Sequence, residues 1–331
     1  MSRKNLIKVT LLLLVMLMAA ACRATPPLAT PTPTKVMVML DWFPNTNHTG
    51  LYVALDKGWY AEEGLDVEIV EPAEGSTLVQ VVAAGQADFG ISYQEEVSHA
   101  RAQDIPIVSV AAIIQHNTSG FASPADRNIH RPKDFEGKRY GSWGSPIERA
   151  VLDVLMSCDG GDVNEVDFID IGWADFFTVV QRDVDFAWIF YAWTGIQAEL
   201  RDMPLDTVLL SDWAECVPDY YTPTIITGEQ NVSDKPDLVG NFMTATSRGY
   251  DFAIQDPAEA AEILLKYAPE SDPDLVRRSQ EWLASRYQAD APRWGEQELE
   301  IWQGYADWMA DRDVLPRHIN AQEAFTNEFL P

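Results

Sequence analysis

The residues best suited to binding chemistry follow a short apolar run near the start of the chain. Residues 36–40 are continuously apolar, which is typical of a strand buried on both faces of a parallel sheet. Pro44 should end that strand, and a helix should begin near Thr49. The loop between strand and helix carries Trp42, Asn45, Asn47 and His48. Because open α/β sheets bind ligands at the carboxyl ends of their strands, this loop predicts a binding site.

Further aromatic and polar side chains follow the strands that we expect downstream. These strands cover residues 65–70, 87–92, 106–114, 139–141, 168–171, 185–191, 208–210 and 220–226. The residues near their ends that we predict to contact a ligand are Tyr93, Glu95, Gln115, Asn117, Trp143, Trp173, Trp188, Tyr191, Trp193 and Tyr221. Indole and phenol rings stack on flat heteroaromatic rings, and the polar neighbours would bind the ring edge. No Arg or Lys lies in these loops, which disfavours a phosphate or sulfonate ligand, although helix N-termini also bind small anions.

Glu148 has two roles open to it. Ser145 and Pro146 suit the N-cap and first position of a helix, and Glu148 then falls at the third position, where it would complete a capping box. Its position just beyond the strand end at Trp143 is equally compatible with a ligand contact. The sequence leaves both roles open.

The amino terminus has the pattern of an export signal. A basic start is followed by an apolar run, residues 11–21, which is too short to span a bilayer and ends in three alanines. The next residue, Cys22, completes a pattern that resembles a bacterial lipobox. We therefore expect residues 1–21 to be removed as a signal peptide and Cys22 to carry the lipid anchor; an ordinary signal peptide is the alternative. The Pro/Thr-rich residues 22–34 predict an extended spacer that holds an extracytoplasmic body at the cell membrane.

The charge of the chain is strongly acidic. Fifty-one acidic residues face 24 basic ones, a formal charge of −27, and loss of the basic signal would make it more negative still. Such an excess speaks against nucleic acid or an anionic surface as a partner. Cys158 and Cys216 are compatible with a disulfide or with two free thiols, and no Cys or His at ligand spacing predicts a metal site.

Strand and helix patterns alternate as βαβαβ and predict an α/β protein with doubly wound, mostly parallel sheets. Residues 81–92 also resemble residues 179–190, since each segment has a helix end, a turn, Asp-Phe and a strand. This weak repeat predicts two similar lobes that face each other across a ligand cleft, with Tyr93 and Tyr191 at equivalent strand ends.

The lobes can be placed along the chain. We assign residues 35–125 and 225–331 to the first lobe and residues 126–224 to the second. The last hundred residues carry apolar side chains at helical spacing. The tryptophans expected in the core of these helices are Trp282, Trp302 and Trp308.

Several motifs carry a family resemblance. Residues 40–50 (LDWFPNTNHTG), 57–60 (KGWY), 64–67 (GLDV) and 85–89 (GQADF) resemble the solute-binding lipoproteins of the thiamine-pyrimidine synthase-like family. The first motif is specific, whereas the Gly-Gln-Ala-Asp turn is shared by many solute-binding proteins. The resemblance runs from about residue 35 to the last helices. It implies a two-lobed, type II periplasmic-binding-protein fold that closes on one ligand and delivers it to an ABC permease driven by an ATP-binding subunit.

The resemblance also bears on the ligand. Family members include binding proteins for formylaminopyrimidine, a thiamine precursor, and for riboflavin. Residues 188–195 (WIFYAWTG) are most similar to the riboflavin-binding branch, and the number of aromatic residues suits a three-ring ligand. We therefore expect riboflavin, with a pyrimidine precursor of thiamine as the alternative.

An enzyme and a lipid-anchored sensor are the alternatives from other classes of function. The synthases of this family use an active-site histidine, a lysine-bound cofactor and a cysteine-rich iron-binding stretch. Here the corresponding residues, 156–161, contain one cysteine, so we expect no catalytic residues and no cofactor. A lipid-anchored sensor without transport is the third alternative, which neighbouring permease and ATPase genes would argue against.

Overall fold

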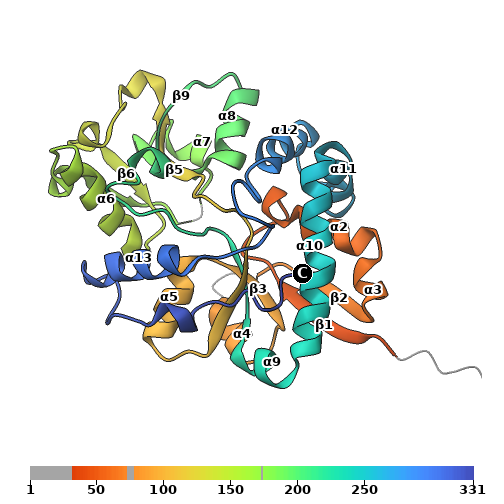
Figure 1. Cartoon of the computed structure of the whole chain (residues 1–331). Coiled ribbons are helices and arrows are strands. Elements are labelled where there is room, and N and C mark those ends of the chain that lie inside the picture. The colour runs from red at the N-terminus through yellow and green to blue at the C-terminus, as the bar shows by residue number, and fades with distance from the viewer. Residues whose placement is uncertain (1–31, 73–77, 173) are drawn as a thin grey trace, which may run out of the picture. The chain divides into compact units, whose positions relative to one another are not determined.

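The computed structural model describes residues 32–72, 78–172 and 174–331, and it contains two five-stranded sheets (Figure 1). The first has the strand order β2-β1-β3-β10-β4 and the second β7-β6-β8-β5-β9. The strands of the first sheet are β1 (Thr34–Met39), β2 (Leu65–Val70), β3 (Phe89–Ser92), β4 (Ile107–Ala112) and β10 (Thr224–Gly228). Those of the second are β5 (Ser119–Pro124), β6 (Arg139–Ser142), β7 (Asp167–Asp170), β8 (Phe186–Phe190) and β9 (Leu205–Leu209).

Both sheets follow the same plan. In the first, β1 pairs in parallel with β2 and β3, and β10 runs antiparallel between β3 and β4. In the second, β6 pairs in parallel with β7 and β8, and β5 runs antiparallel between β8 and β9. The predicted α/β class with mostly parallel sheets is confirmed. The two halves of the weak repeat end on β3 and β8, which hold equivalent places.

Helices connect and cover these strands (Figure 1). They are α2 (Thr49–Asp56), α3 (Trp59–Glu62), α4 (Leu78–Ala83), α5 (Gln94–Ala102), α6 (Pro146–Cys158), α7 (Phe176–Val179), α8 (Ile196–Leu200), α9 (Glu229–Asp234), α10 (Pro236–Gln255), α11 (Pro257–Tyr267), α12 (Pro273–Ala284) and α13 (Leu299–Ala310). Helix α2 begins at Thr49, as the sequence predicts. Trp302 and Trp308 are buried as expected, whereas Trp282 is only partly buried.

The strand β5 corrects the predicted division of the chain. The sequence places residues 119–124 in the first lobe and predicts no strand there, but they form β5, which pairs with β8 and β9 in the second sheet. The chain therefore passes to the second sheet before Ser119 and not at residue 125. The pairing of β5 with distant strands, and not a local apolar pattern, makes this segment a strand.

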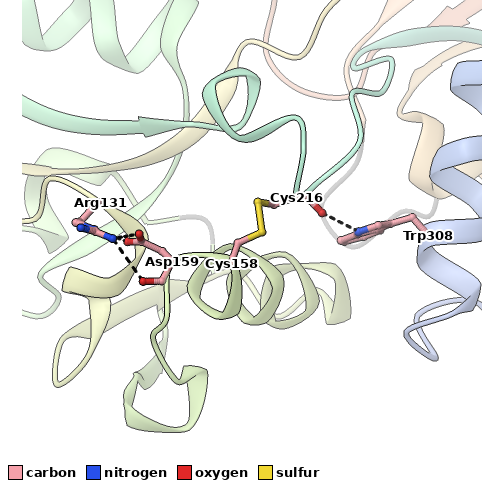
Figure 2. Close-up of a disulfide and its surroundings, with 5 residues drawn as sticks. All are labelled: Arg131, Cys158, Asp159, Cys216 and Trp308. Carbon is pink, nitrogen blue, oxygen red and sulfur yellow. Dashed lines mark hydrogen bonds and ion pairs between the residues drawn. A yellow bond between two sulfur atoms is a disulfide. The ribbon is translucent and has the colours of Figure 1, made fainter.

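Cys158 and Cys216 form a disulfide, which settles the alternative that the sequence left open (Figure 2). The bond joins the last residue of α6 to the loop after the 3-10 helix η6 (Leu210–Trp213). On the far side of that loop, the indole Nε1 of Trp308 donates to the Cys216 carbonyl oxygen at 3.2 Å (Figure 2). The disulfide and this bond together tie α6 to α13.

Some expectations concern residues outside the described ranges. The predicted signal peptide, the lipid-anchor residue Cys22 and nearly all of the spacer are among them, as is Trp173. Within the described ranges, no helix is long and apolar enough to cross a membrane.

Candidate functional site

The loop after β1 is fixed by one carboxylate, Asp41. Its Oδ1 accepts a hydrogen bond from His48 Nε2 at 2.7 Å, and its Oδ2 accepts one from the Tyr93 hydroxyl at 2.6 Å. The other ring nitrogen of His48 accepts the backbone N–H of Asn45 at 3.2 Å, so Nε2 carries the proton. Burial raises the pKa of Asp41, but the bonds from His48 and then Tyr93 outweigh it, and the pKa lies below its ordinary value.

This network changes the role expected of His48. The side chain is fully buried and both of its ring nitrogens are engaged within the loop, so it positions the loop and has no ring nitrogen left over for a ligand. Asn47 is partly buried, and its carbonyl oxygen accepts the Tyr250 hydroxyl at 2.6 Å. The loop is therefore held from both sides, which presents Trp42 on a rigid support.

Four large rings are exposed at the carboxyl ends of strands. Trp42 and Phe43 follow β1, Trp143 follows β6, and Phe190 is the last residue of β8. Their exposed fractions are 38%, 61%, 43% and 38%, and they make up four of the six large apolar side chains that are exposed in the described part of the chain. Exposed apolar side chains that adjoin one another mark candidate binding sites, as Trp42 and Phe43 do with 5.6 Å between their ring centroids.

Phe43 and Phe190 are exposed at strand ends but are not among the residues that the sequence predicts to contact a ligand. Phe43 stands beside Trp42 in the first motif, and Phe190 lies two residues beyond Trp188, so it shares a face of β8 with that tryptophan. The period of two along the strand was the signal that would have identified Phe190. Position relative to the predicted strand end points to Tyr191 instead.

Rings from the two sheets meet at one point. Tyr93 follows β3 of the first sheet, and its ring centroid lies 6.5 Å from that of Phe190 with an angle of 20° between the planes. The predicted partner of Tyr93, Tyr191, instead packs against Trp282 of α12 at 5.5 Å. Its hydroxyl donates to Glu199 at 2.8 Å. The facing pair is therefore Tyr93 and Phe190, since a shift of one residue along a strand reverses the direction of the side chain.

Three of the residues predicted to contact a ligand carry a buried polar atom that meets no hydrogen-bond partner by distance and angle among the described residues. They are Glu95 Oε2, Asn117 Nδ2 and Trp188 Nε1. Burial raises the pKa of Glu95 to about 8. Trp188 packs between Phe121 and Trp143, with ring centroids at 5.0 and 5.4 Å. Of these three side chains, Trp188 adjoins an exposed ring, that of Trp143, so its Nε1 is a candidate contact for a polar ligand atom.

Glu148 has the local role that the capping box predicts. Its carboxylate accepts hydrogen bonds from the Tyr140 and Ser142 hydroxyls at 2.7 and 3.0 Å. It also accepts the backbone N–H groups of Trp143 and Ser145 at 3.1 and 2.7 Å. These four donors use the carboxylate fully, so Glu148 supports the turn that presents Trp143 and leaves nothing for a ligand.

Three further residues predicted to contact a ligand are engaged in internal packing. Gln115 is buried, and its Nε2 donates to the Glu296 carbonyl oxygen at 3.0 Å. Tyr221 is fully buried, and its hydroxyl accepts the Glu298 N–H at 2.9 Å. Trp193 packs partly buried against the core of the first sheet. Tyr221, predicted within a strand over residues 220–226, lies before β10, which begins at Thr224. The direction of each of these side chains is set by distant segments that pack on it.

Known proteins are similar to this chain over most of its length. A family model described as NMT1/THI5 like matches residues 45–260. A formylaminopyrimidine-binding protein of Halalkalibacterium halodurans is 29% identical over 97% of this chain and 98% of its own. The riboflavin-binding protein RibY of Chloroflexus aurantiacus is 26% identical over 95% and 91%, and a 4-amino-5-hydroxymethyl-2-methylpyrimidine phosphate synthase of Legionella pneumophila is 25% identical over 90% and 92%.

Solved structures show the same fold. The alkanesulfonate-binding protein SsuA of Xanthomonas axonopodis, bound to MOPS, matches with a TM-score of 0.68 at 16% identity and covers 90% of this chain and 99% of its own. The two-lobed periplasmic-binding-protein fold predicted from the sequence is thereby confirmed.

Proposed function

Since this chain belongs to the NMT1/THI5-like family, we propose that it is the solute-binding protein of an ABC importer and that its ligand is a flat heteroaromatic vitamin, riboflavin in the first place. The observation that carries the proposal is the set of exposed rings at the strand ends of both sheets, with Tyr93 facing Phe190. Rings supplied by two lobes sandwich a planar ligand and exclude water from its faces. Closure on the ligand then presents the complex to a permease and its ATP-binding subunit.

One polar atom favours riboflavin. Trp188 Nε1 is a buried donor without a partner among the described residues, so a ligand edge that meets it must offer an acceptor. The isoalloxazine ring carries two carbonyl oxygens and unprotonated ring nitrogens on one side, which suits such a donor. Formylaminopyrimidine is the second candidate, because the relative that binds it has the higher sequence identity.

Binding without chemical conversion is part of the proposal. The similar proteins include a synthase, and the family resemblance implies that its synthases use a histidine and a cysteine-rich stretch. Here His48 uses both ring nitrogens within its own loop, and Cys158 is bonded to Cys216. Neither side chain is free to act on a substrate.

The proposal also places the protein outside the cell, anchored through a lipid on Cys22. Support comes from the basic and apolar residues that precede Cys22 and from the disulfide, since disulfides form in oxidising compartments. Labelling with radioactive palmitate in a bacterial host, compared with a Cys22→Ala variant, tests the anchor.

Titration of the purified chain from residue 23 onward tests the ligand. Riboflavin should quench the tryptophan fluorescence and raise the melting temperature, and formylaminopyrimidine should do so less. Phe190→Ala should weaken riboflavin binding by roughly 5- to 100-fold, the loss typical of a buried aromatic contact. Tyr267→Ala, which removes an exposed ring on α11, is the matched control and should bind as the unaltered protein does. If neither compound binds, the proposed ligand class is wrong.

A further inference from the structure

We infer that His116 is a pH-sensitive clamp at the hinge between the two halves of the molecule, and that its protonated ring holds the halves closed. The ring lies between Asp219 and Asp290, which belong to two other segments of the chain. The inference concerns the opening and closing of the protein itself. It therefore goes beyond the proposed function and needs no particular ligand.

The strand topology identifies the hinge. Residues 113–118 connect β4 of the first sheet to β5 of the second, and residues 214–223 lead back from η6 to β10 of the first. These two crossover segments lie side by side, since the N–H of Ile113 donates to the Pro223 carbonyl oxygen at 2.9 Å. Any rotation of one sheet against the other must be absorbed by the backbone of these segments.

A third segment, residues 285–298 between α12 and α13, packs on the first crossover. The side chain of Gln115 donates to the Glu296 carbonyl oxygen at 3.0 Å. Trp294 Nε1 donates to the Ile113 carbonyl oxygen at 3.2 Å. Because Trp294 is buried in the core that packs on the first sheet, this segment moves with the first half.

Only a protonated ring satisfies both aspartates. His116 Nδ1 lies 2.6 Å from Asp219 Oδ2, and Nε2 lies 2.9 Å from Asp290 Oδ1. A neutral imidazole has one N–H, so its other nitrogen would turn a lone pair toward a carboxylate oxygen, whereas an imidazolium donates to both. Asp219 is also held by the backbone N–H groups of Asn117 and Tyr220, while Asp290 is exposed. On loss of the proton it is therefore Asp290 that turns away, which releases the third segment from the crossover.

The two carboxylates favour the proton on the ring. Burial lowers the pKa of His116, but the hydrogen bonds and charges of Asp219 and Asp290 outweigh it, and the pKa lies above its ordinary value of 6.5. Since opening separates the ring from Asp290, the clamp stabilises the closed form fully below that ordinary value. The stabilisation is lost as the pH rises through the higher value.

The other titratable side chains of the three segments leave these partners unchanged. Arg293 pairs with Glu296 at 2.6 Å, and the guanidinium of Arg286 lies over the ring of Trp282. Three phenols on these segments have a pKa that burial raises, so they stay neutral near pH 7; they are Tyr220, Tyr221 and Tyr287. The remaining carboxylates are exposed and would only add to the negative potential that favours the proton; they are Glu215 and Glu298.

Small-angle X-ray scattering of the unliganded chain from residue 23 onward tests the clamp. The radius of gyration should be smallest at pH 5.5 and rise above pH 6.5. The ratio of open to closed molecules should grow by at most about tenfold per pH unit, because a single proton is released. His116→Gln carries no charge to lose, so its radius of gyration should have the larger value at every pH.

His318→Gln is the matched control. His318 lies 3.1 Å from Asp307 and 3.6 Å from Asp311, an arrangement like that of His116, but both aspartates belong to the end of α13. This histidine does not join the hinge segments, so its variant should follow the unaltered protein at each pH. Nuclear magnetic resonance of the imidazole should give a pKa above 6.5 for His116 and a lower pKa in Asp290→Asn.

A radius of gyration that stays constant with pH, or that rises equally in His116→Gln, would overturn the inference. A pKa of His116 at or below 6.5 would do the same. Because riboflavin takes no part in these measurements, the inference can fail while riboflavin still binds. Absence of riboflavin binding would overturn the proposed function and leave the hinge result as it is.

Discussion

Asp41 shows how one buried side chain fixes the ligand loop. It accepts two hydrogen bonds, one from His48 of its own loop and one from Tyr93 beyond β3, so it joins two strand ends of the first sheet. Charged acceptors of this kind contribute more than neutral ones, about 1.5–3 kcal/mol for each bond. The ring of Tyr93 is thereby held where it faces Phe190.

Replacement of this carboxylate should loosen the loop. Asp41→Asn puts an N–H group opposite the His48 N–H or the Tyr93 hydroxyl, so one bond is lost. We expect the free energy of unfolding at pH 7 to fall by about 2 kcal/mol and riboflavin binding to weaken. Urea denaturation measures the first and fluorescence titration the second. Asp126→Asn, at an exposed aspartate, should change neither.

The effect of Asp41→Asn on the free energy of unfolding should also depend on pH. The pKa of Asp41 in the folded protein lies below its ordinary value of 3.8, so its contribution is complete above that value. The contribution is lost as the pH falls through the lower folded value. The difference in unfolding free energy between the unaltered protein and Asp41→Asn should therefore shrink between pH 5 and pH 2. A constant difference over this range would contradict the assignment.

Helices α2 and α10 pack closely because two glycines meet. A Cβ added at Gly249 of α10 would lie 1.9 Å from the carbonyl oxygen of Gly50 in α2, and one added at Gly50 would lie 2.3 Å from the ring of Tyr250. Both contacts are far inside van der Waals distance, so no other residue fits unless the helices separate. Since Tyr250 also binds the carbonyl oxygen of Asn47, this contact supports the ligand loop.

An alanine at Gly249 should therefore destabilise the protein. We expect Gly249→Ala to lower the free energy of unfolding by about 1–3 kcal/mol, the range typical of overpacking. Gly304→Ala on α13 is the control, because a Cβ there meets nothing within 4 Å. Alanine suits a helix interior better than glycine, so the control should be neutral or stabilising by about 0.5–1 kcal/mol. Equal effects of the two changes in urea denaturation would contradict the packing argument.

The disulfide between Cys158 and Cys216 also contributes to the free energy of unfolding. It joins residues 58 apart in sequence and holds α6 against the loop beside α13. In the chain-entropy account, a loop of this length stabilises the folded state by roughly 4 kcal/mol. Reductant should lower the unfolding free energy by an amount of this order. A variant with Ser at positions 158 and 216 should match the reduced protein and not respond to reductant.

Side-chain contacts join the two halves of the molecule, each of which is built around one of the two sheets. Arg278 of α12 pairs with Glu199 of α8 at 2.5 Å, and Glu199 also accepts the Tyr191 hydroxyl. Tyr191 in turn packs on Trp282 of α12. Helix α12 packs on the first half and α8 lies in the second, so this group of four side chains links them. We expect these contacts to stabilise the closed conformation, in which the two halves enclose the ligand, relative to the open one.

Loss of that ion pair should affect ligand retention more than folding. Arg278→Ala should increase the rate of riboflavin dissociation several-fold and lower the unfolding free energy by no more than about 1 kcal/mol, since exposed pairs contribute little to stability. Arg277→Ala is the matched control, because its partner Glu262 belongs to α11, which packs beside α12. Stopped-flow release of riboflavin distinguishes them. The same release rate in both variants would show that the pair does not hold the halves together.

The sequence alone determined what depends on a few neighbouring residues. The strand at β1, the start of α2, the capping box of Glu148, the α/β class and the repeat of the two sheets all follow from apolar periodicity and local hydrogen-bond chemistry. It also identified the stretch that carries Trp42, which the structure exposes at the end of β1.

Only the tertiary structure decided what depends on distant segments. The placement of β5, the pairing of Cys158 with Cys216, the burial of Tyr221 and the meeting of Tyr93 with Phe190 each join residues more than 50 positions apart or turn on packing from them. A local pattern specifies which face of an element is apolar. It does not specify which distant surface that face meets, because the free energy that selects the partner comes from burial of both surfaces together.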